Sequence, residues 1–279
     1  MVSRPVPADW LALRRAADHR ARERAAGLLR RLGDHVGERT GQELVVLDIG
    51  AGTGSNQAWL APRLPGPQRW VLVDHDPDLL GQAGAAVPGA DVTTRRAVAT
   101  VEEVHSLVPS GGEVLVTCAA LLDLLTVAQL NALADVIAPT GRPGVAALLS
   151  LTVTGDVEIS PPHQADAAVT AAFDDHQRRE DRPGPKATEA MAAALRRRGA
   201  DVELAATDWE LDASDESLVR RYLQDRAAVA VEQDATLAPL AREWLAAREG
   251  SLMDGSLRVR VGHLDLLSLP SEPGSGSGG

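Results

Sequence analysis

Three glycines at alternate positions, Gly50, Gly52 and Gly54, directly follow the apolar run 44–49. Glycine is required where the backbone passes close to a ligand and a Cβ atom would clash with it. The spacing is Gly-x-Gly-x-Gly, whereas dinucleotide-binding turns carry Gly-x-Gly-x-x-Gly. Asp48 immediately precedes the glycines, and its carboxylate would repel a pyrophosphate. The turn therefore favours a ligand that carries positive charge.

A second acidic residue, Asp74, follows the next apolar run, 70–73. An acidic residue about twenty positions beyond a glycine turn is placed to accept hydrogen bonds from ribose hydroxyls. A glycine turn and an acidic strand end in consecutive βα units predict a nucleoside ligand. That ligand would lie across the carboxyl ends of the strands.

The elements that must position these residues form an alternating pattern. Short apolar runs alternate with helical stretches up to residue 152, which predicts βαβ units and a parallel sheet covered on both faces by helices. The predicted strands are 44–49, 70–73, 91–95, 114–117 and 145–152. The predicted helices are 9–36 (Asp9 as N-cap, Gly33 and Gly37 at its end), 55–63, 78–86, 101–108 and 127–137.

The pattern changes after residue 152. Residues 153–185 are polar and interrupted by prolines, with one predicted helix. The alternating run 257–267 is predicted to pair antiparallel at the sheet edge. The elements predicted in this half are helices 165–179, 188–198, 214–233 and 237–248, strands 202–207 and 257–267, and a Ser/Gly/Pro tail at 270–279.

The run Leu-Asp-Ile-Gly-Ala-Gly-Thr-Gly at 47–54, with Asp74 downstream, resembles the glycine motif and ribose-binding acid of the class I S-adenosylmethionine-dependent methyltransferases. The resemblance covers residues 41–152 well and 186–269 only through topology. It implies an α/β fold: a Rossmann-like, seven-stranded, mostly parallel sheet with helices on both faces and an antiparallel last strand. The implied organisation is a helical N-terminal extension (1–40), a methyltransferase domain (41–269) with a lid insertion at 153–185, and a disordered tail (270–279).

The resemblance also implies a role for each matching residue. The three glycines would lie under the methionine part of S-adenosylmethionine, Asp48 would orient the loop and the amino group, and Asp74 would hold the ribose. Many family members place an acid after the third strand, near adenine. Here that stretch is Thr-Arg-Arg-Ala-Val, so backbone near Arg96 and Ala97 would serve instead. The implied cofactor-binding set is Asp48, Gly50, Ala51, Gly52, Gly54, Asn56, Asp74, His75, Arg96, Ala97 and Cys118.

The implied reaction is an in-line displacement at the sulfonium methyl, and the charge and aromatic content favour a small-molecule acceptor. Net charge is −11, so the cheapest source of affinity for nucleic acid is missing. The segment after the fourth strand lacks the Asn/Asp-Pro-Pro-Tyr motif of enzymes that methylate bases. Two alternatives stay open: an accessory or regulatory cofactor-binding protein without transferase activity, and an RNA or protein methyltransferase supported by the Arg-rich helix 9–36. No targeting segment or membrane span is visible, so we expect a cytoplasmic protein, and the oligomeric state, including a homodimer, is left open.

Few side chains are candidates for the chemistry itself. His176 in the predicted lid is the candidate base, because an unperturbed imidazole titrates near neutrality. Phe173 and Gln177 beside it, and Asp123 after the fourth strand, are candidate acceptor contacts; Asp123 could instead N-cap a turn. Cys118 and His263 are expected to be packing residues, and His163 is a weaker lid candidate. We predict no metal site, since the adjacent acids Asp174 and Asp175 would point to different sides of a helix.

Overall fold

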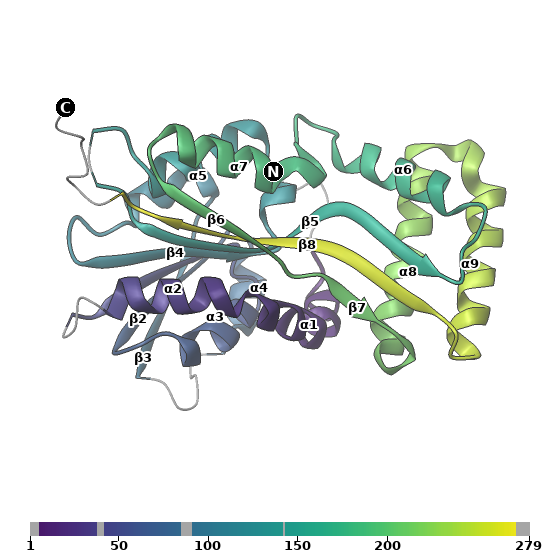
Figure 1. Ribbon diagram of the computed structural model, residues 1–279, viewed down its shortest axis with the longest axis horizontal. Coiled ribbons are helices and arrows are strands. Elements are labelled where there is room, and N and C mark those ends of the chain that lie inside the picture. Colours follow the sequence, from purple (N-terminus) through teal and green to yellow (C-terminus); the bar gives the residue numbers. More distant parts are fainter. Residues whose placement is uncertain (1–5, 38–41, 85–90, 142, 272–279) are drawn as a thin grey trace.

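The computed structural model describes residues 6–37, 42–84, 91–141 and 143–271. Within these ranges, the strands form one sheet in the order β3-β2-β1-β4-β5-β8-β6, with β7 paired to β8 (Figure 1). The strands are β1 (Leu44–Ile49), β2 (Gln68–Asp74), β3 (Val92–Val98), β4 (Glu113–Ala119), β5 (Ala146–Ser160), β6 (Asp201–Ala206), β7 (Trp209–Leu211) and β8 (Arg258–Leu269).

The pairing confirms the predicted Rossmann-like sheet. Strands β3, β2, β1, β4 and β5 are parallel, and β8 is antiparallel. The predicted edge position of the last strand is wrong, because β8 lies between β5 and β6. Residues 265–269 of β8 are buried, so this strand belongs inside the sheet. The more polar β6, whose residues are only partly buried or exposed, takes the edge.

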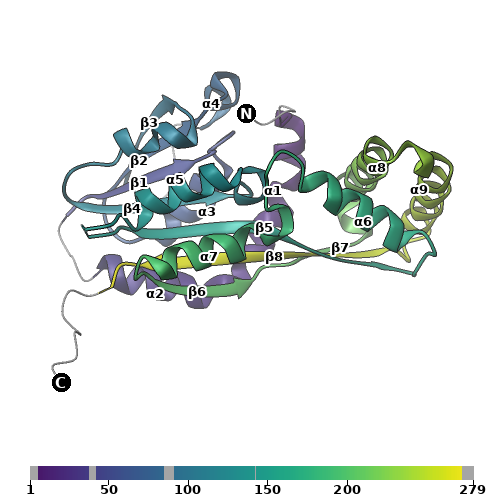
Figure 2. The ribbon, with the colours of Figure 1, turned by 90° about the horizontal axis from the view of Figure 1, so that it is seen from above.

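Helices cover both faces of the sheet (Figure 2). The α-helices are α1 (Ala8–Arg22), α2 (Ala26–Gly37), α3 (Ser55–Leu60), α4 (Pro77–Gln82), α5 (Val127–Ile137), α6 (Asp166–Gln177), α7 (Ala187–Arg197), α8 (Glu216–Gln233) and α9 (Ala238–Met253). The 3-10 helices are η1 (Glu23–Ala25), η2 (Ala61–Arg63), η3 (Val101–Ser106), η4 (Leu122–Leu124), η5 (Gly184–Lys186), η6 (Ala213–Asp215) and η7 (Ala235–Leu237).

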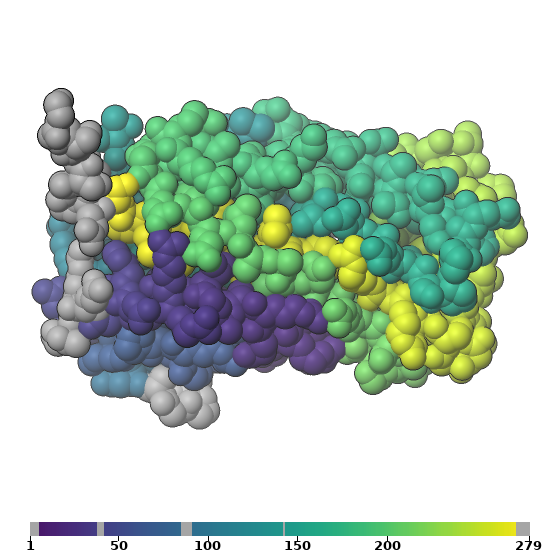
Figure 3. All heavy atoms as spheres, in the orientation of Figure 1, coloured from purple at the N-terminus to yellow at the C-terminus, as the bar shows by residue number. Residues whose placement is uncertain are grey.

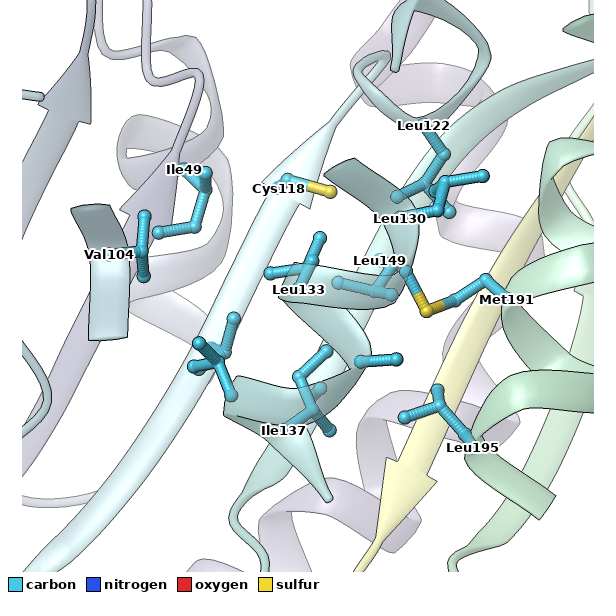
Figure 4. Close-up of a cluster of buried hydrophobic side chains, with 14 of the residues drawn as sticks. Ile49, Val104, Cys118, Leu122, Leu130, Leu133, Ile137, Leu149, Met191 and Leu195 are labelled. Atoms are coloured by element: carbon cyan, nitrogen blue, oxygen red, sulfur yellow. The ribbon is translucent and has the colours of Figure 1, made fainter. Parts of the chain in front are cut away.

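The alternation of side chains along the central strands builds two hydrophobic layers. On one face Val45 and Leu47 of β1 pack with Leu133 of α5 and with residues of α7 (Figure 4). On the other face Leu44 and Val46 pack with residues of α2 and α3. A one-residue shift would exchange these faces, so the register of β1 is firmly specified, and with it the place of the loop that follows.

The predicted helix 9–36 is interrupted by the 3-10 turn η1. Pro7, rather than Asp9, occupies the N-cap position, and the Asp9 carboxylate accepts a hydrogen bond from the adjacent Trp10 N–H at 2.9 Å. Gly33 lies inside α2, which ends at Gly37. The part of the predicted helix 78–86 beyond residue 84, and the tail from 272 onward, lie outside the described residues.

Strands β5 and β8 continue past the other long strands as an antiparallel ribbon, and β7 pairs with the outer part of β8 (Figures 1 and 2). This ribbon, with β7 and helices α6, α8 and α9, surrounds a hydrophobic cluster of its own, and we call this part the helical lobe. The predicted strand ends at Thr152, whereas β5 runs to Ser160. In the outer half of β5, exposed acids alternate with the partly buried Val157 and Ile159. The polar residues predicted a loop, although alternation of buried and exposed residues is the period of a strand. No helix within the described ranges is long and apolar enough to cross a membrane.

Candidate functional site

The glycine loop joins β1 to α3 at the carboxyl end of the sheet. Gly50, Gly52 and Gly54 have φ angles of 65°, 52° and 80°, in the left-handed region that side chains with a Cβ rarely adopt. The loop is tied to the neighbouring strand, because the Ala51 N–H donates to the Val73 carbonyl at 3.0 Å. The motif therefore has a backbone conformation that favours glycine at all three positions.

Asp74 at the end of β2 holds this loop from the side. Its Oδ2 accepts the Gly52 N–H at 2.8 Å, and its Oδ1 accepts the Asp76 N–H at 3.0 Å. His75 Nδ1 lies 3.2 Å from Oδ1. Each carboxylate oxygen has a second acceptor position, which is what ribose hydroxyls require. The structure thus brings together the two parts of the motif that the sequence separates.

Asp48 lies under the loop and is fully buried. Its Oδ1 accepts a hydrogen bond from Asn56 Nδ2 at 2.7 Å, whereas its Oδ2 has no partner among the described residues. Burial raises the pKa of Asp48 to about 7, against the opposing effects of the Asn56 hydrogen bond and the nearby Arg22 charge. A buried carboxylate with an unused oxygen is suited to a positively charged ligand group.

We expect Asp48→Asn to stabilise the cofactor-free protein more at pH 8 than at pH 5. The pKa of Asp48 is about 7 in the folded state, whereas an ordinary solvated aspartate has a pKa of 3.8. The folded state therefore binds the extra proton, and this carboxyl destabilises it progressively as the pH rises between those two values. At pH 8 the loss is complete, on the order of a few kcal/mol at about 1.4 kcal/mol per pKa unit. Thermal unfolding of both proteins at pH 5, 6, 7 and 8 measures the difference, in which other titrating groups cancel. An equal difference at every pH would contradict the prediction.

The surface of the glycine loop is covered by two flexible side chains. A Cβ placed on Gly50 would lie 2.9 Å from Leu121 Cδ1, and one on Gly52 would lie 3.0 Å from Leu11 Cδ1 of α1. At Gly50 and Gly52 the contacts are therefore with side-chain ends rather than with backbone. Together with the unused Asp48 oxygen and the Asp74 carboxylate, this arrangement fits the methionine and ribose parts of S-adenosylmethionine.

The neighbouring strand β3 places an exposed apolar residue beside Asp74, at a position that the predicted strand did not reach. Val98 pairs with Asp74 in the sheet register and its surface is 63% exposed, unusual for a valine. Arg96 instead donates from its side chain to the Ala83 carbonyl at the end of α4, and Ala97 packs against the core. The sequence signal was an apolar residue at the strand end, but the predicted strand stopped at residue 95.

Ala120, directly after β4, and Leu151, inside β5, have strained backbones. Ala120 has a φ of 55° and Leu151 a φ of 58°, and the Ala120 N–H donates to the Ser150 carbonyl at 2.9 Å. Asp123 follows in η4 and is 8% exposed. Burial raises its pKa to about 6, opposed by its own backbone N–H and by Arg14 and Arg182. Such strain persists only where surrounding structure enforces it, and it gathers at functional sites.

The three candidate residues of the lid lie on α6. His176 Nε2 is 3.2 Å from Glu232 Oε1 on α8, and the Phe173 ring lies 4.3 Å from the Arg226 guanidinium carbon. Gln177 packs against Gly184. The hydrogen bonds described for His176 do not reach Asp123 or the glycine loop. Its role as a base, and those of Phe173 and Gln177, stay predictions.

The remaining candidates lie in packed surroundings. Cys118 is fully buried in the hydrophobic layer beside α5, and burial raises the pKa of its thiol (Figure 4). The His263 ring is 5.0 Å from the Trp209 ring, and burial lowers the pKa of His263 to about 4.

A hollow of about 240 Å³ lies at the amino-terminal end of the parallel strands, opposite the glycine loop, and is lined by residues such as Pro139 and Pro270.

Comparison with known proteins agrees with this geometry. Residues 46–144 match a family model described as a methyltransferase domain. A search of curated protein sequences finds no match. Among solved structures, a cyclopropane-fatty-acyl-phospholipid synthase-like protein from Lactobacillus casei is 15% identical, with 95% of this chain and 94% of that one covered and a TM-score of 0.53.

Two other solved structures are more distant in shape. A methyltransferase from Geobacter sulfurreducens in complex with S-adenosylhomocysteine is 16% identical over 97% of this chain and 100% of that one, with a TM-score of 0.43. The small RNA methyltransferase HEN1 is 15% identical over 65% of this chain, which spans only 23% of HEN1, with a TM-score of 0.42. The glycine motif, its geometry and the family match together show that residues 46–144 carry a class I S-adenosylmethionine-dependent methyltransferase domain.

Proposed function

We propose that this protein transfers the methyl group of S-adenosylmethionine to a small-molecule acceptor by in-line displacement. The observation that carries the proposal is the hydrogen bond from Gly52 N–H to the Asp74 carboxylate, which joins the two halves of the cofactor motif. The cofactor, when bound, supplies an electrophilic methyl group. The chain's own residues bind the cofactor, orient the acceptor and exclude water.

Each part of the site has a separate task in this proposal. The glycine loop and Asp48 hold the methionine end, and Asp74 accepts from the ribose hydroxyls. His75 and the exposed Val98 flank the adenosine. Acceptor contacts come from the strained turn at Ala120, from Asp123, and from the helical lobe that adjoins it.

The charge distribution supports a small acceptor over RNA. The only sequence support for RNA was the Arg-rich helix 9–36, and several of its arginines pair with acids of the chain itself. Arg20 lies 2.6 Å from Asp215, Arg24 lies 2.8 Å from Glu210, and Arg31 lies 2.7 Å from Glu203. These acids lie in residues 201–215, and Figure 3 shows the N-terminal part of the chain, in purple, lying against this green segment. These ion pairs link the N-terminal helical segment to the edge of the sheet. The paired arginines are therefore less available to bind phosphates.

Asp74→Ala is expected to weaken cofactor binding by about 1–3 kcal/mol, or roughly 5- to 150-fold, from a micromolar wild-type affinity of about −8 kcal/mol. The change removes the ribose acceptor and leaves the Gly52 and Asp76 N–H groups without their partner. Calorimetric titration of S-adenosylmethionine and S-adenosylhomocysteine measures it. Asp78→Ala is the matched control, since Asp78 is an exposed acid on the next turn. Absence of any heat or thermal shift with wild-type protein would overturn the proposed function.

A cofactor-binding protein without transferase activity is the second candidate. This candidate is retained because few side chains near the glycine loop are obvious catalytic acids or bases. Incubation of the protein with methyl-labelled S-adenosylmethionine and fractions of a metabolite extract separates the two. Label recovered in a new compound, with S-adenosylhomocysteine released in equal amount, identifies a transferase.

A further inference from the structure

Arg22, the last residue of α1, lies outside the segment that matches the methyltransferase model, yet it is buried against that segment. Only 1% of the surface of Arg22 is accessible to solvent, and its guanidinium carbon lies 3.8 Å from the centre of the Trp59 ring. Its Nη1 donates to Asn56 Oδ1 at 2.8 Å. Nε and Nη2 have no partner among the described residues. An arginine buried so completely needs a reason, because desolvating its charge is costly.

The Asn56 side chain connects Arg22 to Asp48. Its oxygen accepts from Arg22, and its nitrogen donates to Asp48 Oδ1 at 2.7 Å and to Thr117 Oγ1 at 3.1 Å. Thr117 Oγ1 in turn donates to the Leu148 carbonyl at 2.8 Å. Both ends of the amide are occupied, so the amide can point in only one direction. The donors of the two bonds that link Arg22, Asn56 and Asp48 both point towards Asp48, and successive hydrogen bonds polarise one another.

The charges around Asp48 show why this matters. Arg22 is the positive group that acts on the Asp48 carboxylate, Asp74 is the negative group opposing it, and the buried Cys118 thiol lies close by. Arg22 also faces Asp265, a buried carboxylate of β8 whose Oδ1 accepts from the Leu151 N–H and from a threonine hydroxyl. Asp18 and His19, on the same helix, are the remaining titratable groups near Arg22. No carboxylate among the described residues is within ion-pair distance of Arg22.

We propose that Arg22 is a positioning residue of the cofactor site, which acts through Asn56 to keep the Asp48 carboxylate ionised and oriented for the positively charged methionine end. The inference rests on the proposed function. The N-terminal helix is then a working part of the cofactor site, in addition to being a cover over it. Burial raises the pKa of Asp48 to about 7 even with the Arg22 charge opposing it, so without Arg22 a larger share of molecules would hold this carboxyl protonated at neutral pH.

The test is the ratio of wild-type to Arg22→Met affinity for S-adenosylhomocysteine at pH 6.5, 7.5 and 9. The ratio removes the titration of the ligand's own amino group, which is common to both proteins. We expect Arg22→Met to bind about 10- to 100-fold more weakly at pH 7.5, and the ratio to approach 1 at pH 9, where Asp48 ionises without help. Arg22→Lys keeps the charge and should stay within about threefold of wild type. Arg15→Met, an exposed arginine on the same helix, is the matched control.

A purely structural Arg22 would give a different result. The ratio would then be the same at every pH, and Arg22→Lys would lose as much affinity as Arg22→Met; either outcome overturns the inference. Should Arg22→Met fail to fold, Arg22→Gln offers an uncharged donor of similar length, and the same pH ratio decides. Wild-type protein that binds no S-adenosylhomocysteine would refute the proposed function itself, whereas normal wild-type binding with a flat ratio refutes only the role of Arg22.

Discussion

Gly52→Val is expected to reduce affinity for S-adenosylhomocysteine by on the order of 100-fold or more. At a φ of 52° an L-residue is strained by about 1–2 kcal/mol, and a β-branched side chain by more. The loop cannot easily relax, because the Gly52 N–H is held by Asp74 at 2.8 Å. The new side chain would also meet Leu11 and occupy the surface that the cofactor must approach. Calorimetric titration measures the loss, with the thermal midpoint recorded in parallel.

Gly33→Val is the matched control for this experiment. It makes the same chemical change on α2, where a Cβ would meet nothing within 4 Å. We expect it to retain wild-type affinity. If Gly52→Val bound the ligand normally, the glycine loop would not be the cofactor site.

His176→Ala is expected to leave cofactor affinity intact and to lower turnover by about 10²–10⁴-fold, the usual range for losing a general base. When His176 Nε2 donates its proton to Glu232, Nδ1 is left as the proton acceptor. The end of α6 that carries His176 is connected to the sheet through η5, which packs against η4, where Asp123 lies. Transfer of labelled methyl to an acceptor found by the extract screen measures the rate.

His176→Gln sharpens this prediction, because an amide can hydrogen-bond but cannot take the proton. It should restore little activity. Normal turnover in both variants would remove His176 from the reaction and leave Asp123 as the remaining candidate among the proposed acceptor contacts. With a pKa of about 6, Asp123 is ionised at neutral pH and able to accept a proton. Asp123→Asn would then give the large loss, and wild-type turnover would fall below pH 6.

The sequence was sufficient for the parts of the site that are local. The turn after β1, the acid at the end of β2 and the βαβ alternation are each specified within a short stretch. Arg22 could not have been identified, because its contact with Asn56 joins residues 34 positions apart that share no pattern. Val98 was missed because the predicted strand stopped too early.

Strand order was harder to predict than strand content. The run 257–267 reads correctly as a strand, but nothing in its own residues says which neighbours it will have. The burial of residues 265–269 decides this, and burial depends on β5 and β6, which lie elsewhere in the chain. The length of β5 was underestimated for the same reason, since its outer half is stable only as the partner of β8.

The ribbon formed by β5 and β8 has a mechanical consequence. Both strands run from the sheet into the helical lobe, so the two parts are joined by a paired backbone ladder with two register shifts rather than by a flexible linker. A rigid-body rotation of the helical lobe relative to the sheet would break hydrogen bonds between β5 and β8. Bending should therefore concentrate at the two register shifts, between Leu149 and Thr152 and between Val153 and Val157. The first of these contains the left-handed Leu151 and adjoins Ser150, whose carbonyl accepts from the Ala120 N–H. In the proposed function, where Ala120 contacts the acceptor, stiffness at that joint would limit the size of acceptor that can enter and the rate at which product leaves.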